Sequence, residues 1–384
     1  MIRLLVFGAF LALVSWLLHR RLTHAVGLGP RGTRAVAVAL AGAWVLALVG
    51  LGSGEVFDPS WARGPAFVGW VWLAVMLYLA LGLLLVAAVS GASRLLSRTG
   101  GGESSGPGLT RRRLLRGATA TVVLASFTAV GYGVGEAATP RVRHVRVPLR
   151  RLPAEFAGTR IALVTDLHVG PARGAGFTRE VVSAVSAERP DLVLLGGDLV
   201  DGTVAKVGTD LAPLADLRAP LGVFGVSGNH EFYAGDGGRW LDLWDRLGIH
   251  TLRNARVELS RGEAVVDLAG IHDFTSPAPY EPDLHAALAG RNPDRLVMLL
   301  AHEPKQALEA NELGVDLQLS GHTHGGQMWP LGYLVPLQQP SATGLDRIGE
   351  TVLYTSRGAG AWGPPVRVAA PPEITILELA VDPG

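Results

Sequence analysis

Hydrophobic residues form long runs in the first third of the chain, whereas the remainder alternates short apolar and polar stretches. The run at residues 66–89 contains no charged residue and exceeds the roughly 20 residues that cross the hydrocarbon core of a bilayer. Residues 35–51 are long enough to span, residues 4–18 are short, and residues 117–135 are diluted by glycine and threonine. The pattern predicts four membrane-spanning helices. Burial in a protein core is the alternative, and it applies more readily to the first and fourth runs than to the third.

Arginines are unevenly distributed between these runs, which predicts an orientation. Those before the second and fourth runs are Arg20, Arg21, Arg31, Arg34, Arg94, Arg98, Arg111, Arg112, Arg113 and Arg116. The segment between the second and third runs has only Arg63. The positive-inside rule therefore places the arginine-rich segments in the cytoplasm and the chain after the fourth run outside. If only three spans insert, the chain after the fourth run stays in the cytoplasm, a location that the basic stretch 141–151 also favours. We nevertheless favour the outside placement.

Residues 110–116, Thr-Arg-Arg-Arg-Leu-Leu-Arg, resemble a twin-arginine export signal within the chain. An ordinary cytoplasmic charge anchor explains them equally well. Residues 97–110 are expected to form a linker, because glycine, serine and proline predominate. No Ala-x-Ala cleavage site follows the fourth run, so we expect an anchor at 1–136 to be retained. The protein is then an integral protein of the bacterial cytoplasmic membrane with its larger domain outside.

From residue 160 the pattern predicts an α/β domain, at 158–381, after a connecting segment at 137–157. The predicted strands are 161–164, 192–195, 222–226, 265–271, 296–300, 315–319, 351–355 and 374–379, and the predicted helices are 177–188, 207–217 and 240–247. Strands that alternate with helices favour parallel pairing in a layered structure.

Composition narrows the chemistry. The formal net charge of +1 gives no bias toward nucleic acid, and we expect no nucleic-acid partner. With no cysteine among the 384 residues, disulfides, thiolate metal ligands and cysteine nucleophiles are all excluded. Any metal must be held by His, Asp, Glu, Asn or backbone oxygen.

Five predicted strands end in such side chains. In chain order these are Asp166 and His168, Asp198, Asn229 and His230, His302, and His322 with His324. A structural histidine or a helix-capping aspartate explains any one case, but hardly all five. Ligands bind beyond the carboxyl ends of strands in open α/β sheets, where several loops meet. Oxygen and imidazole donors suit Mn, Fe or Zn. Because one metal needs only three or four groups, the surplus predicts two divalent metal ions with a carboxylate between them.

The blocks D-x-H, G-D-x-x-D, G-N-H-E, a strand-end His and G-H-T-H, in this order, resemble the calcineurin-like metallophosphoesterases over about residues 158–380. The resemblance implies a four-layer α/β/β/α sandwich with a dinuclear site at one edge. It implies one metal held by Asp166, His168, Asp198 and His324, and another held by Asp198, Asn229, His302 and His322. His230 matches the catalytic histidine, which contacts the phosphate or protonates the leaving oxygen, and Asn229 would also stabilise charge on the transferring group.

Neighbouring residues are assigned supporting roles. Asp201 and Glu231 are expected to orient histidine ligands, with a purely structural role as the alternative. An extended conformation would let His322 and His324 face two adjacent metals. The tail at 354–374 resembles a membrane-tethered branch related to UDP-2,3-diacylglucosamine pyrophosphatases and bacterial exported phosphoesterases. In that branch, Arg357 or Arg367 would hold a substrate phosphate. We favour the alternative, in which the arginine supports a loop of the protein.

The resemblance implies a metal-dependent phosphoester hydrolase, in which a hydroxide bridging two metals attacks phosphorus of a phosphomonoester, phosphodiester or pyrophosphate. We expect a membrane or cell-envelope substrate, which the membrane location would allow to be lipid-linked. The alternative is a catalytically silent membrane-bound binding protein, against which the complete ligand set argues. A transporter is disfavoured because the apolar runs contain no Asp, Glu or Lys. The sequence names neither the substrate nor the oligomeric state.

Overall fold

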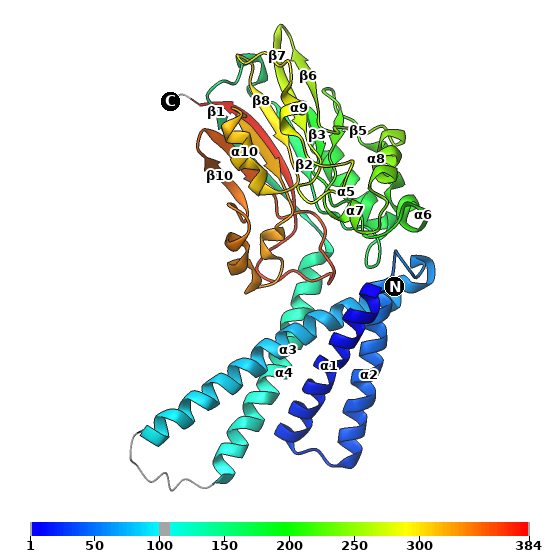
Figure 1. Ribbon diagram of the computed structural model, residues 1–384, viewed down its shortest axis with the longest axis vertical. Coiled ribbons are helices and arrows are strands. Elements are labelled where there is room, and N and C mark those ends of the chain that lie inside the picture. Colours follow the sequence, from blue (N-terminus) through cyan, green and yellow to red (C-terminus); the bar gives the residue numbers. More distant parts are fainter. Residues whose placement is uncertain (1, 100–107, 383–384) are drawn as a thin grey trace.

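The computed structural model describes residues 2–99 and 108–382 and has two parts, an N-terminal helical bundle and a C-terminal sandwich (Figure 1). The bundle contains α1 (Ile2–Val26), α2 (Pro30–Gly52), α3 (Pro59–Thr99) and α4 (Gly108–Ala138). Each helix contains one of the four predicted apolar runs and extends beyond it. Most of the predicted linker at 97–110 lies outside the described residues, and residues 110–116 belong to the start of α4.

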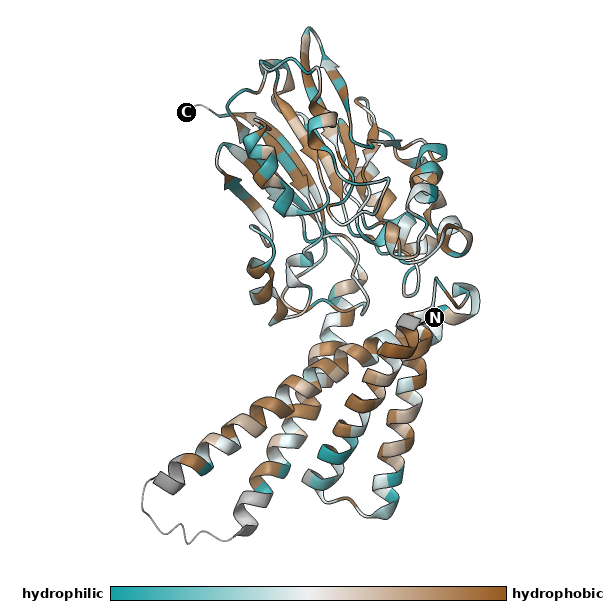
Figure 2. Cartoon of the chain, viewed as in Figure 1, coloured by the Kyte–Doolittle hydropathy of each residue, from teal (hydrophilic) through white to brown (hydrophobic). Residues whose placement is uncertain are grey.

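The helices of the bundle consist largely of hydrophobic residues (Figure 2). Within the described residues, four helices are long and apolar enough to cross a membrane, and between 17% and 28% of each one's most apolar window is buried. Side chains such as Val38, Leu84 and Leu124 are therefore exposed, at 73%, 66% and 70%. In water such a surface would be strongly unfavourable, whereas lipid tails would cover it.

The sandwich contains two six-stranded sheets. The first has the order β1 (Arg141–Leu149), β12 (Glu373–Val381), β2 (Arg160–Val164), β3 (Leu192–Leu195), β4 (Val223–Gly225) and β5 (His250–Thr251). The second has the order β10 (Gly344–Ile348), β11 (Thr351–Thr355), β9 (Leu317–Ser320), β8 (Val297–Leu300), β7 (Ala264–Gly270) and β6 (Ala255–Arg261). All eight predicted strands are present, with bounds within about two residues of those expected.

Pairing is mixed, so the expectation of parallel pairing is only partly correct. The strands β2, β3 and β4 are parallel, but β12 is antiparallel to β2 and the hairpins β6–β7 and β10–β11 are antiparallel. The unpredicted strand β1 pairs with β12 along its whole length. Its sequence, Arg-Val-Arg-His-Val-Arg-Val-Pro-Leu, is too charged to signal a buried strand, and charged side chains are typical of an edge.

Three apolar clusters separate the layers and confirm the predicted four-layer α/β/β/α sandwich. Alternate residues of β2 show the arrangement, because successive side chains of a strand point to opposite faces. Ala162 and Val164 pack with helices α5 and α8, whereas Ile161 and Leu163 pack against the second sheet. A third cluster joins the outer face of the second sheet to α9 and α10.

The helices of the sandwich are mostly short. They are α5 (Ala175–Ala187), α6 (Val204–Val207), α7 (His230–Tyr233), α8 (Gly237–Arg246), α9 (Leu284–Leu288) and α10 (Ala307–Glu312). The 3-10 helices are η1 (Ala154–Phe156), η2 (Gly208–Asp216), η3 (Pro304–Gln306), η4 (His324–Gly326) and η5 (Leu331–Leu337). The helix predicted at 207–217 is instead α6 followed by η2. Pro213 lies inside η2, and a proline removes one of the backbone donors that an α-helix needs.

The loop between α2 and α3, together with the first turns of α3, contacts the sandwich. The Gly54 carbonyl accepts the backbone N–H of Thr203 at 3.1 Å. The Lys206 ammonium donates to the Glu55 carbonyl at 2.7 Å. The Arg63 guanidinium pairs with Asp210 at 2.5 Å. The bundle is thus attached to the loop that follows β3, one of the loops that carry the predicted ligands.

Candidate metal centre

Adjacent strands bring the predicted ligands to one edge of the sandwich. The loops after β2, β3 and β4, which are neighbours in the first sheet, carry Asp166, His168, Asp198, Asn229 and His230. The loops after β8 and β9, neighbours in the second sheet, carry His302, His322 and His324. Because the parallel strands of each sheet end at the same edge, side chains separated by more than 100 residues in sequence meet there.

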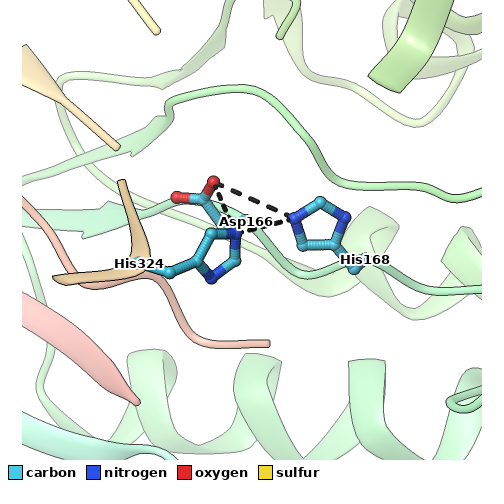
Figure 3. A group of neighbouring side chains, drawn as sticks. All are labelled: Asp166, His168 and His324. Carbon is cyan, nitrogen blue, oxygen red and sulfur yellow. Dashed lines mark hydrogen bonds and ion pairs between the residues drawn. The ribbon is translucent and has the colours of Figure 1, made fainter. Parts of the chain in front are cut away.

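Asp166, His168 and His324 form a first buried cluster, with their polar atoms directed toward one another (Figure 3). The Nε2 atoms of His168 and His324 are 3.0 Å apart. The His324 Nε2 atom also lies 3.4 Å from Asp166 Oδ1. Three potential donor atoms thus converge within less than 4.8 Å of one another, as the ligands of one metal ion would.

Asp198, His302 and His322 form a second cluster beside the first. The His302 Nε2 atom lies 3.3 Å from Asp198 Oδ2. The His322 Nδ1 atom lies 3.1 Å from the Asn229 Oδ1 atom, which adds an oxygen donor. Asp198 Oδ2 is also 3.9 Å from His168 Nε2, so this carboxylate stands between the two clusters. The arrangement is consistent with a dinuclear metal site.

Hydrogen bonding at His302 shows that a cation fits here. Its Nδ1–H donates to the Gly196 carbonyl at 2.7 Å, so Nε2 is the ring nitrogen that faces the Asp198 carboxylate, at 3.3 Å. That Nε2 atom is buried and has no hydrogen-bond partner. Burial alone would lower the pKa of His302, but the Asp198 carboxylate raises it well above 6.5, so a positive charge, either a proton on Nε2 or a metal ion, is favoured between the two groups. At His168, Nδ1–H donates to Asp201 at 3.0 Å, which likewise leaves Nε2 free to bind a metal.

Ionisation states also suit metal binding, which requires neutral imidazoles and ionised carboxylates. Burial and then the positive charge of Arg367 hold the pKa of His324 well below 6.5. Burial also lowers the pKa of His322. Burial alone would raise the pKa of Asp198, but the nearby rings, that of His302 first, hold it well below 3.8. The rings of His322 and His324 are thus favoured as neutral donors, whereas the Asp198 carboxylate outweighs burial and raises the pKa of His302 well above 6.5, so a metal ion there would take the place of the Nε2 proton.

The backbone at these loops is unusual. Five of the seven predicted metal ligands have positive φ angles, namely Asp166, His168, Asp198, His322 and His324. The expectation of an extended His322-Thr323-His324 segment is therefore wrong, because the chain turns there with φ of 69° and 52° at the two histidines. A side chain at Gly321 would place its Cβ 2.3 Å from Asp166 Oδ2, so only glycine lets this turn approach the carboxylate.

His230 lies at the mouth of the cluster and is held by Asp201. Its Nδ1–H donates to Asp201 Oδ1 at 2.6 Å, and its Nε2 lies 3.9 Å from Asp198 Oδ2. Asp201 therefore orients both His168 and His230, in agreement with the role expected for it. The bundle packs closely against this arrangement at Gly54. A Cβ atom there would lie 2.6 Å from the Asp201 carbonyl oxygen, too close for any residue but glycine.

Glu231 does not orient a histidine, contrary to expectation. Its carboxylate accepts three backbone N–H groups, from Gly228 at 2.6 Å, Leu199 at 2.8 Å and Asp198 at 3.1 Å. The residue is fully buried. It therefore joins the loop after β3 to the loop after β4, and fixes the main chain that carries Asp198 and Asn229.

Arg367 is placed behind the cluster, away from any substrate. It is fully buried, and its guanidinium contacts His324 Nδ1 at 2.9 Å and donates to the carbonyls of Arg357 and Gly360. The favoured interpretation, support of a loop, is thus correct for this residue. Arg357 pairs with Glu373 at 3.3 Å instead of pointing into the cluster.

Sequence reasoning missed two aromatic residues of the site. The Tyr233 hydroxyl accepts the Asn229 amide at 2.7 Å, and Trp362 lies across from His230 with ring centroids 6.4 Å apart. Tyr233 follows the G-N-H-E block by two residues, which was the only available signal. Trp362 comes from a loop 132 residues beyond His230, and nothing local connects them.

The comparisons agree with this geometry. Residues 159–326 match the family described as calcineurin-like phosphoesterase. A transmembrane protein with metallophosphoesterase domain from Danio rerio is 34% identical over 328 residues, which cover 80% of this chain and 74% of that protein. The chain belongs to the calcineurin-like phosphoesterase family.

Two further relatives are similar over shorter stretches. A Bos taurus protein with the same description as the Danio rerio relative is 35% identical over 315 residues, covering 78% of this chain and 70% of that protein. An uncharacterized metallophosphoesterase of Helicobacter pylori is 39% identical over 246 residues, covering 63% of this chain and 64% of that protein. The Danio rerio and Bos taurus relatives are both described as transmembrane proteins.

Proposed function

We propose that the protein is a metal-dependent phosphoester hydrolase with two divalent ions, Mn, Fe or Zn. The observation that carries the proposal is the convergence of the two buried clusters on Asp198, whose Oδ2 lies 3.3 Å from a His302 Nε2 atom that has no hydrogen-bond partner. One ion would be held by Asp166, His168, Asp198 and His324, and the other by Asp198, Asn229, His302 and His322. Such ions lower the pKa of a bound water and neutralise phosphate oxygens.

His230 and Asn229 would serve the transferring group. Burial alone would lower the pKa of His230, but Asp198 and Asp201 outweigh it and raise the pKa to about 9. Because Asp201 accepts its Nδ1–H, the remaining nitrogen, Nε2, faces the site with a proton that can pass to the leaving oxygen. The Asn229 amide is oriented by Tyr233, which supports a role in stabilising charge on the phosphoryl group.

The proposal extends to the organisation of the chain. Residues 1–136 would form the membrane anchor and 158–381 the phosphoesterase domain, and the segment 137–157 is more than a connection, because its strand β1 belongs to the first sheet of that domain. The arginine distribution supports placing that domain outside the cytoplasmic membrane of a bacterium. A substrate of the membrane or cell envelope follows from this placement, in a branch related to exported phosphoesterases and to UDP-2,3-diacylglucosamine pyrophosphatases.

Hydrolysis of a generic substrate tests the function directly. Purified full-length protein should hydrolyse a bis-aryl phosphodiester or an aryl phosphate when Mn is added, and EDTA should abolish the activity. His230→Ala should remove most of the activity while retaining bound Mn, because His230 is not a proposed ligand. The matched control is His285→Ala, an exposed histidine on α9. Metal-loaded protein that turns over no phosphoester would instead favour the catalytically silent binding protein.

Topology needs a separate test. Two reporters are fused in turn after residue 384. The one that works only outside the cytoplasm should be active, and the one that works only in the cytoplasm should be inactive. Activity found only with a cytoplasmic reporter would overturn the outside placement and leave the hydrolase proposal standing.

A further inference from the structure

The cavity that opens onto the cluster has two chemically different sides. It has a volume of about 410 Å³. His168, Asp198, His230 and His322 form the polar side. A second group of lining residues, here called the apolar side, consists of Met328, Leu331, Leu334, Val335 and Trp362. A phosphate group needs only the polar side, so the apolar side is suited to a hydrocarbon part of the substrate.

Three residues of the apolar side, Leu331, Leu334 and Val335, belong to a surface segment, residues 329–337, that is apolar almost throughout. Its sequence is Trp-Pro-Leu-Gly-Tyr-Leu-Val-Pro-Leu, without a charged residue. None of the seven residues of η5, all of them described, is buried. Tyr333 and Leu337 are 76% and 78% exposed. An exposed apolar segment of this kind marks a contact with a membrane or another molecule.

Contacts with the bundle place this segment at the membrane. The Tyr78 hydroxyl of α3 donates to the Trp329 carbonyl at 2.7 Å, and Leu331 packs with the apolar residues of the spans. About 24 Å of helix separates Tyr78 from Arg94, which lies near the far end of α3, at about 1.5 Å per residue. The hydrocarbon core is roughly 30 Å thick. Trp329 therefore lies at the level of the leaflet nearest the sandwich.

A second contact between the bundle and the sandwich independently places this end of the sandwich at the same depth in the membrane. The Gly133 carbonyl of α4 accepts the backbone N–H of Arg367 at 2.9 Å. About 26 Å of helix separates Gly133 from Arg116, at about 1.5 Å per residue. Figure 2 shows hydrophobic colour on the short coils of the sandwich that face the bundle. Tryptophan and tyrosine, both present in residues 329–337, are typical of the boundary between lipid and water.

We propose that residues 329–337 enter the leaflet nearest the sandwich, and that the apolar side of the cavity receives an acyl chain. The substrate is then a phosphoester of a membrane lipid, whose phosphorus reaches the metal centre while its chains stay in contact with the bilayer. The inference rests on the proposed hydrolase function and names its substrate class. The occupant is lipid because the apolar side continues, through Leu331, into the apolar surface of the spans.

Chain-length dependence tests the substrate class. The probes are p-nitrophenyl phosphodiesters with methyl, butyl or octyl as the second group, used as monomers with full-length protein in lipid nanodiscs. Each methylene that is fully buried favours binding by about fourfold. We expect kcat/KM to rise by at least about tenfold from methyl to octyl, because several methylenes would contact the apolar side.

Variants assign this preference to the cavity. Leu334→Asn should reduce the octyl-to-methyl ratio of kcat/KM by at least about fivefold. Leu345→Asn changes a comparably apolar, 42% exposed residue of β10 that does not line the cavity, and it should keep the wild-type ratio. Equal kcat/KM for all three esters in the wild type would overturn the lipid inference alone. Failure to hydrolyse any ester would overturn the proposed function and this inference with it.

Membrane depth provides a readout that does not depend on activity. The chain has no cysteine, so a single Leu337→Cys variant can be labelled cleanly with a fluorophore. In phosphatidylcholine vesicles, lipids carrying a spin label in the acyl chain should quench this fluorophore. The matched control is Leu308→Cys on α10, where the leucine is 56% exposed. Equal, weak quenching at both positions would show that residues 329–337 stay in water and would overturn the inference.

Discussion

Replacing Glu231 by glutamine tests whether one buried carboxylate holds two ligand-bearing loops together. Glu231 accepts N–H groups from Gly228 and Asp198 on Oε2 and from Leu199 on Oε1. Glutamine has one oxygen, so at best it retains the two bonds on one side and turns its NH₂ group toward the third N–H. The change is nearly isosteric, which separates hydrogen bonding from packing.

The expected loss can be sized from these bonds. A hydrogen bond to a charged group contributes roughly 1.5–3 kcal/mol, and a buried donor left without a partner costs about 1–3 kcal/mol. Burial, followed by the charge of Asp198, raises the pKa of Glu231 to about 7, so the carboxylate should be studied at pH 8, where it is ionised. The substitution also removes the repulsion between the carboxylates of Glu231 and Asp198, which offsets part of this loss. We expect Glu231→Gln to destabilise the domain by about 3 kcal/mol.

Thermal unfolding of full-length protein in detergent, followed by near-UV circular dichroism, measures the effect. For a domain of this size, about 3 kcal/mol corresponds to a fall in Tm of roughly 6–12 °C. Mn-dependent hydrolysis should fall as well, because Asp198 and Asn229 lie on the two loops. Glu263→Gln, at an exposed turn between β6 and β7, is the matched control and should leave both unchanged. A Tm of Glu231→Gln within about 2 °C of wild type, with full activity, would refute the reasoning.

Three further changes probe other contacts. Asp201→Asn should weaken Mn binding or activity by about 10–100-fold, seen in Mn titrations of kcat, because a neutral amide replaces the charged carboxylate that accepts from His168 and His230. Gly54→Val should lower kcat, because the new Cβ would collide with the Asp201 carbonyl. The control is Gly29→Val, which should leave kcat unchanged because no atom lies within 4 Å of the new Cβ. Burial lowers the pKa of His272 from 6.5 to about 4. Because the unfolded chain takes up this proton near pH 6.5 and the folded chain only near pH 4, stability should fall by up to about 3 kcal/mol as pH drops across that window. His272→Gln should show a flatter dependence of Tm on pH.

The sequence by itself determined the elements with strong local patterns. The apolar runs predicted the four helices of the bundle, and continuous branched residues predicted strands such as β2 and β3. Residue type was enough to identify the cluster, because Asp, Asn and His side chains that recur at successive strand ends are the donors that a metal site requires. These features are local, since periodicity along a chain reports how each segment is buried.

Only the tertiary structure decided how distant residues are paired. Glu231 binds backbone groups instead of a histidine ring, and Arg367 faces the back of His324 instead of a substrate. The turn at His322 is left-handed, which residue type alone does not reveal for a histidine. The contact between Tyr78 and Trp329 joins residues 251 positions apart, and so brings an apolar surface segment to the spans. Such partners depend on strand order and on the packing of the bundle against the sandwich, for which a local pattern carries no signal.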